Sequence, residues 1–98
     1  MVTDKIYDVL LKDGRNPLFH VEFQGRTTHR PMKWRVLDTM LCLGEGQPGR
    51  TCYHLVFYTG RNAGRNDPGV YQVYDPDGNL ILTWSYRIIR LWEIRPMN

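Results

Sequence analysis

A β-hairpin predicted between Lys5 and Gln24 constrains the fold of this chain more than any other feature. Two runs alternate apolar and polar residues with period two, KIYDVLL and LFHVEFQ. The KDGRNP segment between them carries the turn-forming pairs Asp13-Gly14 and Asn16-Pro17. A hairpin that is symmetric about Arg15, with a five-residue loop from Asp13 to Pro17, has one wholly apolar face. That face would pair Leu11 with Phe19, Val9 with Val21 and Tyr7 with Phe23.

The same register places Asp8 directly opposite Glu22 on the other face, with Gln24 two residues further along. Directly opposed residues have Cβ atoms roughly 5 Å apart, and like charges so placed destabilise a sheet. A bound divalent cation would relieve the repulsion, because hard cations take carboxylate oxygens as ligands. The alternative is a solvent-exposed polar face on a two-stranded edge, since an acidic residue two positions from a polar one is common on strands.

The composition indicates one globular domain covering residues 1–98. The chain is 42% hydrophobic and 23% charged, which is typical of globular proteins. No apolar run approaches the roughly 20 residues that span a bilayer. The first residues, MVTDKIYD, show no basic and apolar leader, so a cytoplasmic location is the default expectation.

The net charge and the cysteines constrain the possible partners and the cellular compartment only weakly. The net charge is +3, and ten of the 13 basic residues are arginines. Arginine is the better bidentate phosphate ligand, which suits a nucleic-acid partner, but a GC-rich genome would give the same bias. Cys42 and Cys52 are predicted to be small buried hydrophobes in a reducing compartment, and their spacing indicates no zinc site.

The remainder of the chain predicts one helix followed by further strands. The helix should begin near Pro31 and end near Leu43, with Gly44 following it, and it could cover the apolar face of the hairpin. Its apolar stripe would consist of Val36, Leu37, Met40 and Leu41, extended by Lys33. The later strands are predicted at Cys52–Thr59, at Val70–Tyr74 and Leu80–Tyr86 as a second hairpin, and at Arg87–Ile94. The expected fold class is α/β: a small mixed sheet with an antiparallel N-terminal hairpin, one main crossover helix and a C-terminal hairpin and strand.

Several segments, in this order, resemble the PD-(D/E)XK nuclease superfamily, and within it the recombination-promoting nuclease and putative transposase group. The matching segments are Asp8-Val9-Leu10-Leu11, His20-Val21-Glu22-Phe23-Gln24, Phe57-Tyr58-Thr59-Gly60 and Ile88-Ile89-Arg90-Leu91-Trp92-Glu93. The resemblance implies a restriction-endonuclease-like core and a metal-dependent DNA endonuclease, linked to recombination or mobile elements. The N-terminal helix that usually precedes the first strand of such enzymes has no counterpart before Lys5.

The resemblance also implies roles for individual residues. Asp8 and Glu22 would hold Mg²⁺ (or Mn²⁺), and Gln24 would stand where many relatives carry a catalytic lysine. The metal would activate water and neutralise charge on the phosphodiester. Gln24 would orient that water or bind the phosphate.

Four basic residues follow Gln24 at the expected entry to the helix: Arg26, His29, Arg30 and Lys33. They could form a phosphate-binding rim beside a helix N-terminus, or they could be a solvated basic turn. His20 is a minor candidate for a general base. The glycine-rich loop Gly60–Gly69 is expected to be a flexible surface loop without a function of its own.

Two functions from different classes therefore remain open. The first is a Mg²⁺-dependent endonuclease acting on DNA. The second is a catalytically inactive remnant of that fold, which binds nucleic acid or a partner subunit. Several members of a group of six aromatic residues are expected in the core and in contacts of a homodimer. The group consists of Trp34, Trp84, Trp92, Tyr71, Tyr74 and Tyr86.

Overall fold

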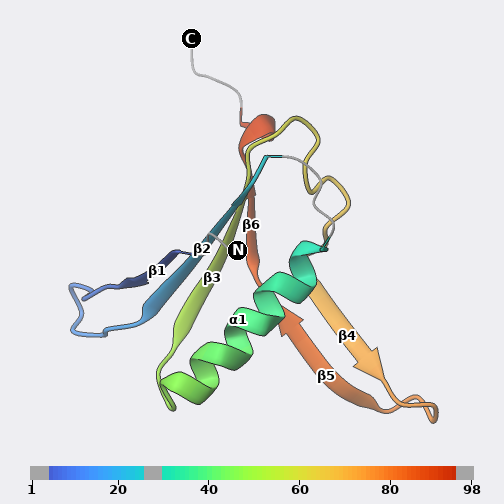
Figure 1. The fold of residues 1–98 in the computed structure, drawn as a ribbon, viewed down its shortest axis with the longest axis horizontal. Helices are drawn as coiled ribbons and strands as arrows, with labels where there is room; N and C mark the ends of the chain where they lie inside the picture. Colours follow the sequence, from blue (N-terminus) through green and yellow to red (C-terminus); the bar gives the residue numbers. More distant parts are fainter. Residues whose placement is uncertain (1–4, 26–29, 95–98) are drawn as a thin grey trace.

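The computed structural model describes residues 5–25 and 30–94 (Figure 1). Its elements, in chain order, are β1 (Lys5–Asp8), β2 (Leu18–Gln24), α1 (Met32–Gly46), β3 (Cys52–Tyr58), β4 (Val70–Tyr74), β5 (Leu80–Ser85), β6 (Arg87–Arg90) and the 3₁₀ turn η1 (Leu91–Glu93). The predicted fold class, a small α/β protein with a mixed sheet, is confirmed.

The main sheet has the strand order β1-β2-β3-β6. β1 pairs antiparallel with β2, whereas β2, β3 and β6 run parallel to one another. α1 connects β2 to β3, as a crossover between parallel strands requires. The β4–β5 hairpin forms a separate antiparallel sheet and connects β3 to β6.

The register of the first hairpin differs from the predicted one by four residues. Tyr7 lies opposite Phe19 rather than Phe23, and Asp8 lies opposite Leu18 rather than Glu22. The difference arises in the turn. Gly14 adopts φ +91°, its amide donates to the Leu11 carbonyl at 3.0 Å, and the Leu11 amide donates to the Arg15 carbonyl at 2.8 Å. The chain therefore reverses at Asp13-Gly14 and not around Arg15.

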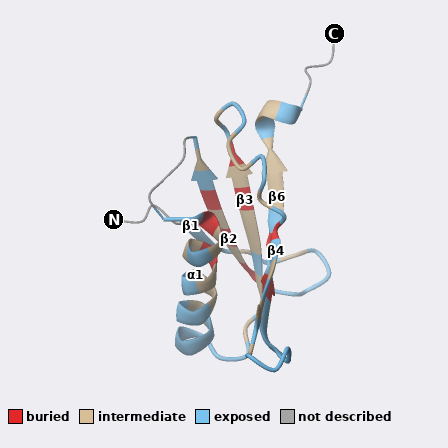
Figure 2. Cartoon of the chain, turned by 90° about the vertical axis from the view of Figure 1, so that its right-hand side faces the viewer, coloured by how far each residue is buried: buried red, intermediate tan, exposed pale blue. Residues whose placement is uncertain are grey.

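α1 lies on one side of the main sheet (Figure 2). That side is the polar face of the hairpin, not the apolar face that the sequence predicted. Met32 and Val36 are buried against Val56 and Tyr58, whose side chains lie on the same sheet face as Glu22. Leu37 and Met40 pack beside them as predicted, but Leu41 points to solvent with 59% of its surface exposed. The helix also continues past the predicted stop at Gly44 to Gly46.

The β4–β5 hairpin completes the core along the N-terminal half of α1. Trp84 is buried; its ring lies 5.5 Å from that of Trp34, and its Nε1 donates to the Lys33 carbonyl at 3.0 Å. The core thus consists of Met32, Val36, Val56, Tyr58, Trp84 and Tyr86. The prediction that several of the six aromatic residues lie in the core is confirmed for Trp84 and Tyr86.

The Gly60–Gly69 loop is held in place by hydrogen bonds rather than loosely attached. The Asp67 carboxylate accepts the hydroxyls of Tyr58, Tyr71 and Tyr86 at 2.5–2.6 Å. Burial raises the pKa of Asp67, but these hydrogen bonds outweigh it, so the net pKa lies below the usual value. Arg90 Nη2 donates to the Asp67 carbonyl at 2.7 Å. The loop therefore has a structural role, because it ties β3, β4 and β6 together.

Two smaller expectations also change. β6 ends at Arg90, and Leu91–Glu93 of the predicted last strand form the turn η1 instead. Both cysteines are free thiols, but Cys42 is exposed, so its predicted burial is wrong. Among the described residues, no helix is long and apolar enough to cross a membrane.

Candidate functional site

The predicted catalytic residues of β2 lie on the sheet face beneath α1, near the carboxyl end of the strand. His20, Glu22 and Gln24 alternate with outward-facing residues, so all three side chains point to the helix side. His20 is fully buried and Glu22 is 1% exposed. A carboxylate this deeply buried must be paired or hydrogen-bonded, because an isolated buried charge is very costly.

Arg35 on α1 supplies that partner. Its Nη2 donates to Glu22 Oε1 at 2.6 Å, and its Nη1 donates to Gln24 Oε1 at 3.2 Å. The planar guanidinium therefore bridges two of the three residues that the sequence predicts to be catalytic. Only 15% of the Arg35 side chain is exposed, so this bridge is an internal link between α1 and β2.

A histidine pair extends the cluster towards β3. His20 and His54 are register partners, and their Nδ1 atoms lie 2.9 Å apart, so one ring donates to the other. His20 Nε2 lies 3.4 Å from Glu22 Oε2. Burial and the neighbouring His20 lower the pKa of His54 to about 4, which leaves His54 neutral at pH 7. These contacts form one continuous polar cluster, called the Glu22 cluster below. Its members are Glu22, His20, His54, Arg35 and Gln24.

Asp8 lies outside the Glu22 cluster, and the predicted pairing of Asp8 with Glu22 is wrong. Asp8 is opposite Leu18, four positions from Glu22 along β2, which corresponds to roughly 13 Å at the rise of a strand. Its exposed carboxylate accepts a 2.7 Å hydrogen bond from Arg50 Nη2. That hydrogen bond holds the pKa of Asp8 below its usual range. Asp8 is therefore paired with Arg50 near the far end of β2.

Only one of the two carboxylates of the predicted metal site lies beside Arg35. Glu22 and Gln24 offer a carboxylate and an amide oxygen next to each other, and Asp8 does not reach them. Within residues 5–25 and 30–94, no group of three or more His, Cys, Asp or Glu side chains is arranged to hold a metal ion.

The predicted basic rim is only partly visible. Arg26 and His29 lie outside the described residues. Arg30 pairs with Asp38 on the surface of α1. The Lys33 Nζ lies 5.3 Å from the Trp34 ring centroid and 5.2 Å from that of Tyr71, so it faces the β4–β5 hairpin. Of the two described rim residues, Arg30 borders the same cavity as Arg35, and Lys33 does not.

That cavity gives access to the Glu22 cluster from the β1 edge. It measures about 330 Å³ and lies between β1 and α1, lined by Ile6, Arg30, Arg35, Asp38, Thr39, Cys42 and Leu43. Arg35 both borders this cavity and contacts Glu22 and Gln24. A ligand in the cavity would therefore meet a guanidinium first, with the carboxylate behind it.

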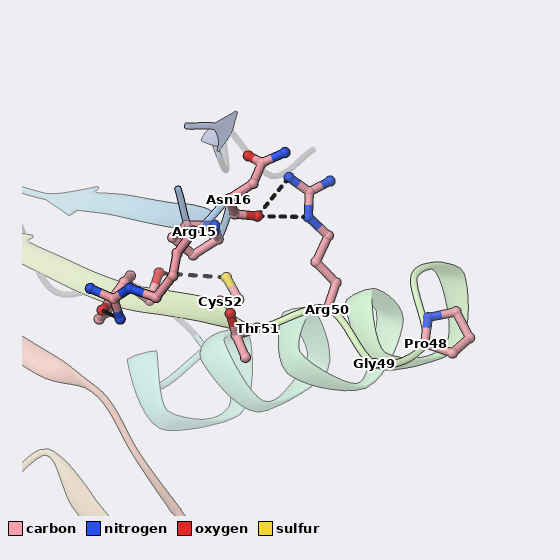
Figure 3. Close-up of a pocket in the computed structure, with 9 residues that line it drawn as sticks. Arg15, Asn16, Pro48, Gly49, Arg50, Thr51 and Cys52 are labelled. Carbon is pink, nitrogen blue, oxygen red and sulfur yellow. Dashed lines mark hydrogen bonds between the residues drawn. The ribbon is translucent and has the colours of Figure 1, made fainter. Parts of the chain in front are cut away.

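A larger cavity of about 740 Å³ lies at the other end of the sheet (Figure 3). It is bordered by the loop before β2 and the loop before β3, at the amino ends of these strands. Its arginines already have partners. Arg50 donates to the Asn16 carbonyl at 3.0–3.1 Å, and Arg15 pairs with Asp13 at 2.7 Å. This cavity contains none of the predicted catalytic residues.

Arg35 and His54 are the members of the Glu22 cluster that sequence reasoning missed. Arg35 stands between Met32 and Val36 in the buried stripe of α1, and an arginine at such a position requires an acidic partner in the core. That requirement was the available signal, since Glu22 is the acid on the neighbouring strand. His54 lies in a nearly continuous apolar run, in which a single polar residue marks a buried contact.

Comparisons with known proteins add no family to this description. No protein-family model matches the chain, and no curated protein or solved structure matches it either. The resemblance to nucleases therefore stays a hypothesis that rests on the residues themselves.

Proposed function

We propose that the chain is a small nuclease-related protein that acts on DNA at the Glu22 cluster. The observation that carries the proposal is the Arg35 guanidinium bridging Glu22 and Gln24 beside a cavity. A carboxylate, an amide and a guanidinium at one point are the groups with which phosphodiester sites bind metal, orient water and hold phosphate. The cytoplasm and a role in recombination or mobile elements belong to the same proposal.

Arg35 has the geometry for the phosphate role. Its fork of N–H donors suits two phosphate oxygens, and its side chain borders the open cavity. Arg30 lies on the same cavity and would add positive charge at its mouth. In this scheme the phosphate takes over the hydrogen bonds that Glu22 and Gln24 now accept from Arg35.

Glu22 and Gln24 would then be free to hold Mg²⁺ or Mn²⁺ through their side-chain oxygens. When bound, such a metal acidifies water and neutralises charge on the phosphodiester. His54 is neutral at pH 7 and contacts His20, so the pair would help to keep the Glu22 side chain in position. Asp8 has no part in this scheme, since it lies roughly 13 Å along the sheet.

A second candidate function follows from that position of Asp8. A nuclease fold that lacks its second carboxylate would bind nucleic acid or a partner without cleaving it. The hydrogen bond from Arg50 to Asp8 favours this inactive form, because it engages the second carboxylate away from Glu22.

Plasmid cleavage tests the enzymatic form. Supercoiled DNA is incubated with Mg²⁺ and one of three proteins: the wild-type chain, Glu22→Gln or Glu45→Gln. Incubations with EDTA are the metal-free control. Glu22→Gln keeps an acceptor for Arg35 but loses the charge that a metal requires, so we expect nicking to fall about 100-fold or more. Glu45 is an exposed acid near the end of α1, and its variant should cleave like the wild type.

Equal nicking by the wild type and Glu22→Gln, with both folded by circular dichroism, would reject the enzymatic form. DNA binding by the wild type without any Mg²⁺-dependent cleavage would support the inactive form. If the chain neither binds nor cleaves DNA, the enzymatic form and the nucleic-acid-binding version of the inactive form both fail.

A further inference from the structure

The face of the main sheet opposite α1 is built from large apolar side chains. The register places ten residues on it: Lys5 and Tyr7 from β1, Phe19, Val21 and Phe23 from β2, Tyr53, Leu55 and Phe57 from β3, and Arg87 and Ile89 from β6. We call this the aromatic face. None of the ten is acidic. Phe23 is 54% exposed and Tyr53 is 39% exposed, although they lie on the inner strands β2 and β3.

The whole chain also exposes more surface than a compact monomer of its size. Its accessible surface is 7514 Å². A folded monomer of 11.6 kDa is expected to expose about 5,800 Å², so the excess is about 1,700 Å². Half of this excess matches the roughly 800 Å² that each subunit contributes to a standard protein–protein interface. A sheet-on-sheet interface of standard size would therefore remove about half of the excess.

The orientation of the rings favours a protein partner over nucleic acid. Phe23 and Phe57 stack across β2 and β3, with centroids 5.2 Å apart and an interplanar angle of 19°. Their separation is close to the strand spacing of roughly 4.8 Å, so the rings stand upright and present their edges outward. A base needs an open ring face to stack on. Upright rings suit the interdigitated packing of two sheets.

The relief of the aromatic face is self-complementary. Tyr7, Phe19 and Tyr53 form one row across the strands, and Phe23, Phe57 and Ile89 form another. The row between them has the smaller Val21 and Leu55 at its centre. A ridge of one copy can therefore fill the trough of a second copy, and a two-fold axis makes the fit mutual.

We propose that the aromatic face is the interface of a homodimer, in which two copies pack sheet against sheet. Lys5 and Arg87 lie at opposite edges of the face, so the dimer brings like charges near each other at its rim. Salt screens such charges and strengthens apolar burial. The dimer should therefore be at least as tight in 0.5 M salt as in 0.05 M salt, whereas nucleic-acid binding weakens with salt. This inference does not depend on the proposed nuclease activity.

Sedimentation equilibrium of the full chain tests the interface, with Phe23→Glu as the disrupting variant. We expect this charge in one of the two aromatic rows of the contact to raise the dimer dissociation constant about 30-fold or more. Ile81→Glu is the matched control, because Ile81 is also an exposed strand residue but lies on β5, outside the face. It should change the constant less than about threefold.

Three results would overturn the proposal. They are a wild-type chain that stays monomeric at millimolar concentration, a dimer that Phe23→Glu does not weaken, and a single-stranded oligonucleotide that binds the face of a monomer. If Phe23→Glu does not fold, contacts between copies are measured instead by nuclear magnetic resonance. The sample mixes isotope-labelled and unlabelled wild-type chains. Contacts between Leu55 methyls and aromatic rings of the other copy support the interface, and their absence overturns it.

Discussion

His54 couples the protonation of the Glu22 cluster to the stability of the protein. Its ring lies within hydrogen-bond distance of His20, and burial together with His20 lowers its pKa from 6.5 to about 4. The unfolded chain binds a proton at His54 more readily than the folded protein does. His54 therefore makes its full contribution to the unfolding free energy above pH 6.5. That contribution is lost progressively as the pH falls from 6.5 towards 4.

We therefore predict that the wild type loses about 1–2 kcal/mol of unfolding free energy between pH 7 and pH 5 through this residue. Urea unfolding at the two pH values measures the loss. His54→Asn keeps polar atoms near His20 but does not titrate, so its stability should change less over this interval. If the unfolding free energy of His54→Asn fell as much between pH 7 and pH 5 as that of the wild type, His54 would not be the group responsible.

At the level of elements, the Arg35 guanidinium is the main polar link between α1 and β2. It contacts Glu22 at 2.6 Å, with 1% of the Glu22 side chain exposed. Removing one partner of a buried ion pair leaves an uncompensated charge, which is usually more costly than removing both partners. The packing of α1 on this face thus depends on both residues together.

The prediction is that Arg35→Met destabilises the protein by about 3 kcal/mol, and that adding Glu22→Gln restores most of the loss. Chemical denaturation of the two single variants and the double variant measures the coupling. Arg30→Met is the control, since Arg30 and Asp38 are about half exposed and such surface pairs contribute less than about 1 kcal/mol. Additive effects of Arg35→Met and Glu22→Gln would mean that the pair does not act as a unit.

The elements themselves were largely predictable from the sequence, because period-two and helical patterns are local. The strands near Leu18, Cys52, Val70 and Leu80 and the helix near Met32 all form close to the predicted places. The face covered by α1 was not predictable in this way. On that face Arg35 of α1 pairs with Glu22 of β2 across the core. The position of Arg35 in the buried stripe of α1 indicates that it needs an acidic partner, but apolar patterning alone does not show which face provides it.

The register of the first hairpin was also beyond local reasoning. Both a tight turn at Asp13-Gly14 and a longer loop reaching Pro17 are compatible with the KDGRNP segment, and they differ by four residues in register. The two registers keep the same residues on each face, so apolar patterning alone does not separate them. Glu22 and Gln24 were therefore assigned to one face correctly, while Asp8 was placed too near them.

For the whole molecule, the register of the first hairpin determines whether Asp8 and Glu22 can act together at one site. With Asp8 opposite Leu18, the Glu22 cluster stands alone at the carboxyl end of β2. With Asp8 opposite Glu22, two carboxylates would meet and a conventional two-carboxylate metal site would exist. The proposed roles of Arg35, Glu22 and Gln24 depend on the first arrangement.

Cross-strand nuclear Overhauser effects between α-protons distinguish the two arrangements directly. Val9 and Leu11 donate their amides across the hairpin, at 3.3 Å to Pro17 and 2.8 Å to Arg15. Asp8 and Leu18 are consequently a non-hydrogen-bonded pair, with Cα atoms about 4.5 Å apart and α-protons facing each other. We predict a strong contact between the α-protons of Asp8 and Leu18, with and without Mg²⁺. A strong contact between those of Asp8 and Glu22 instead would show that this register, and the site built on it, is wrong.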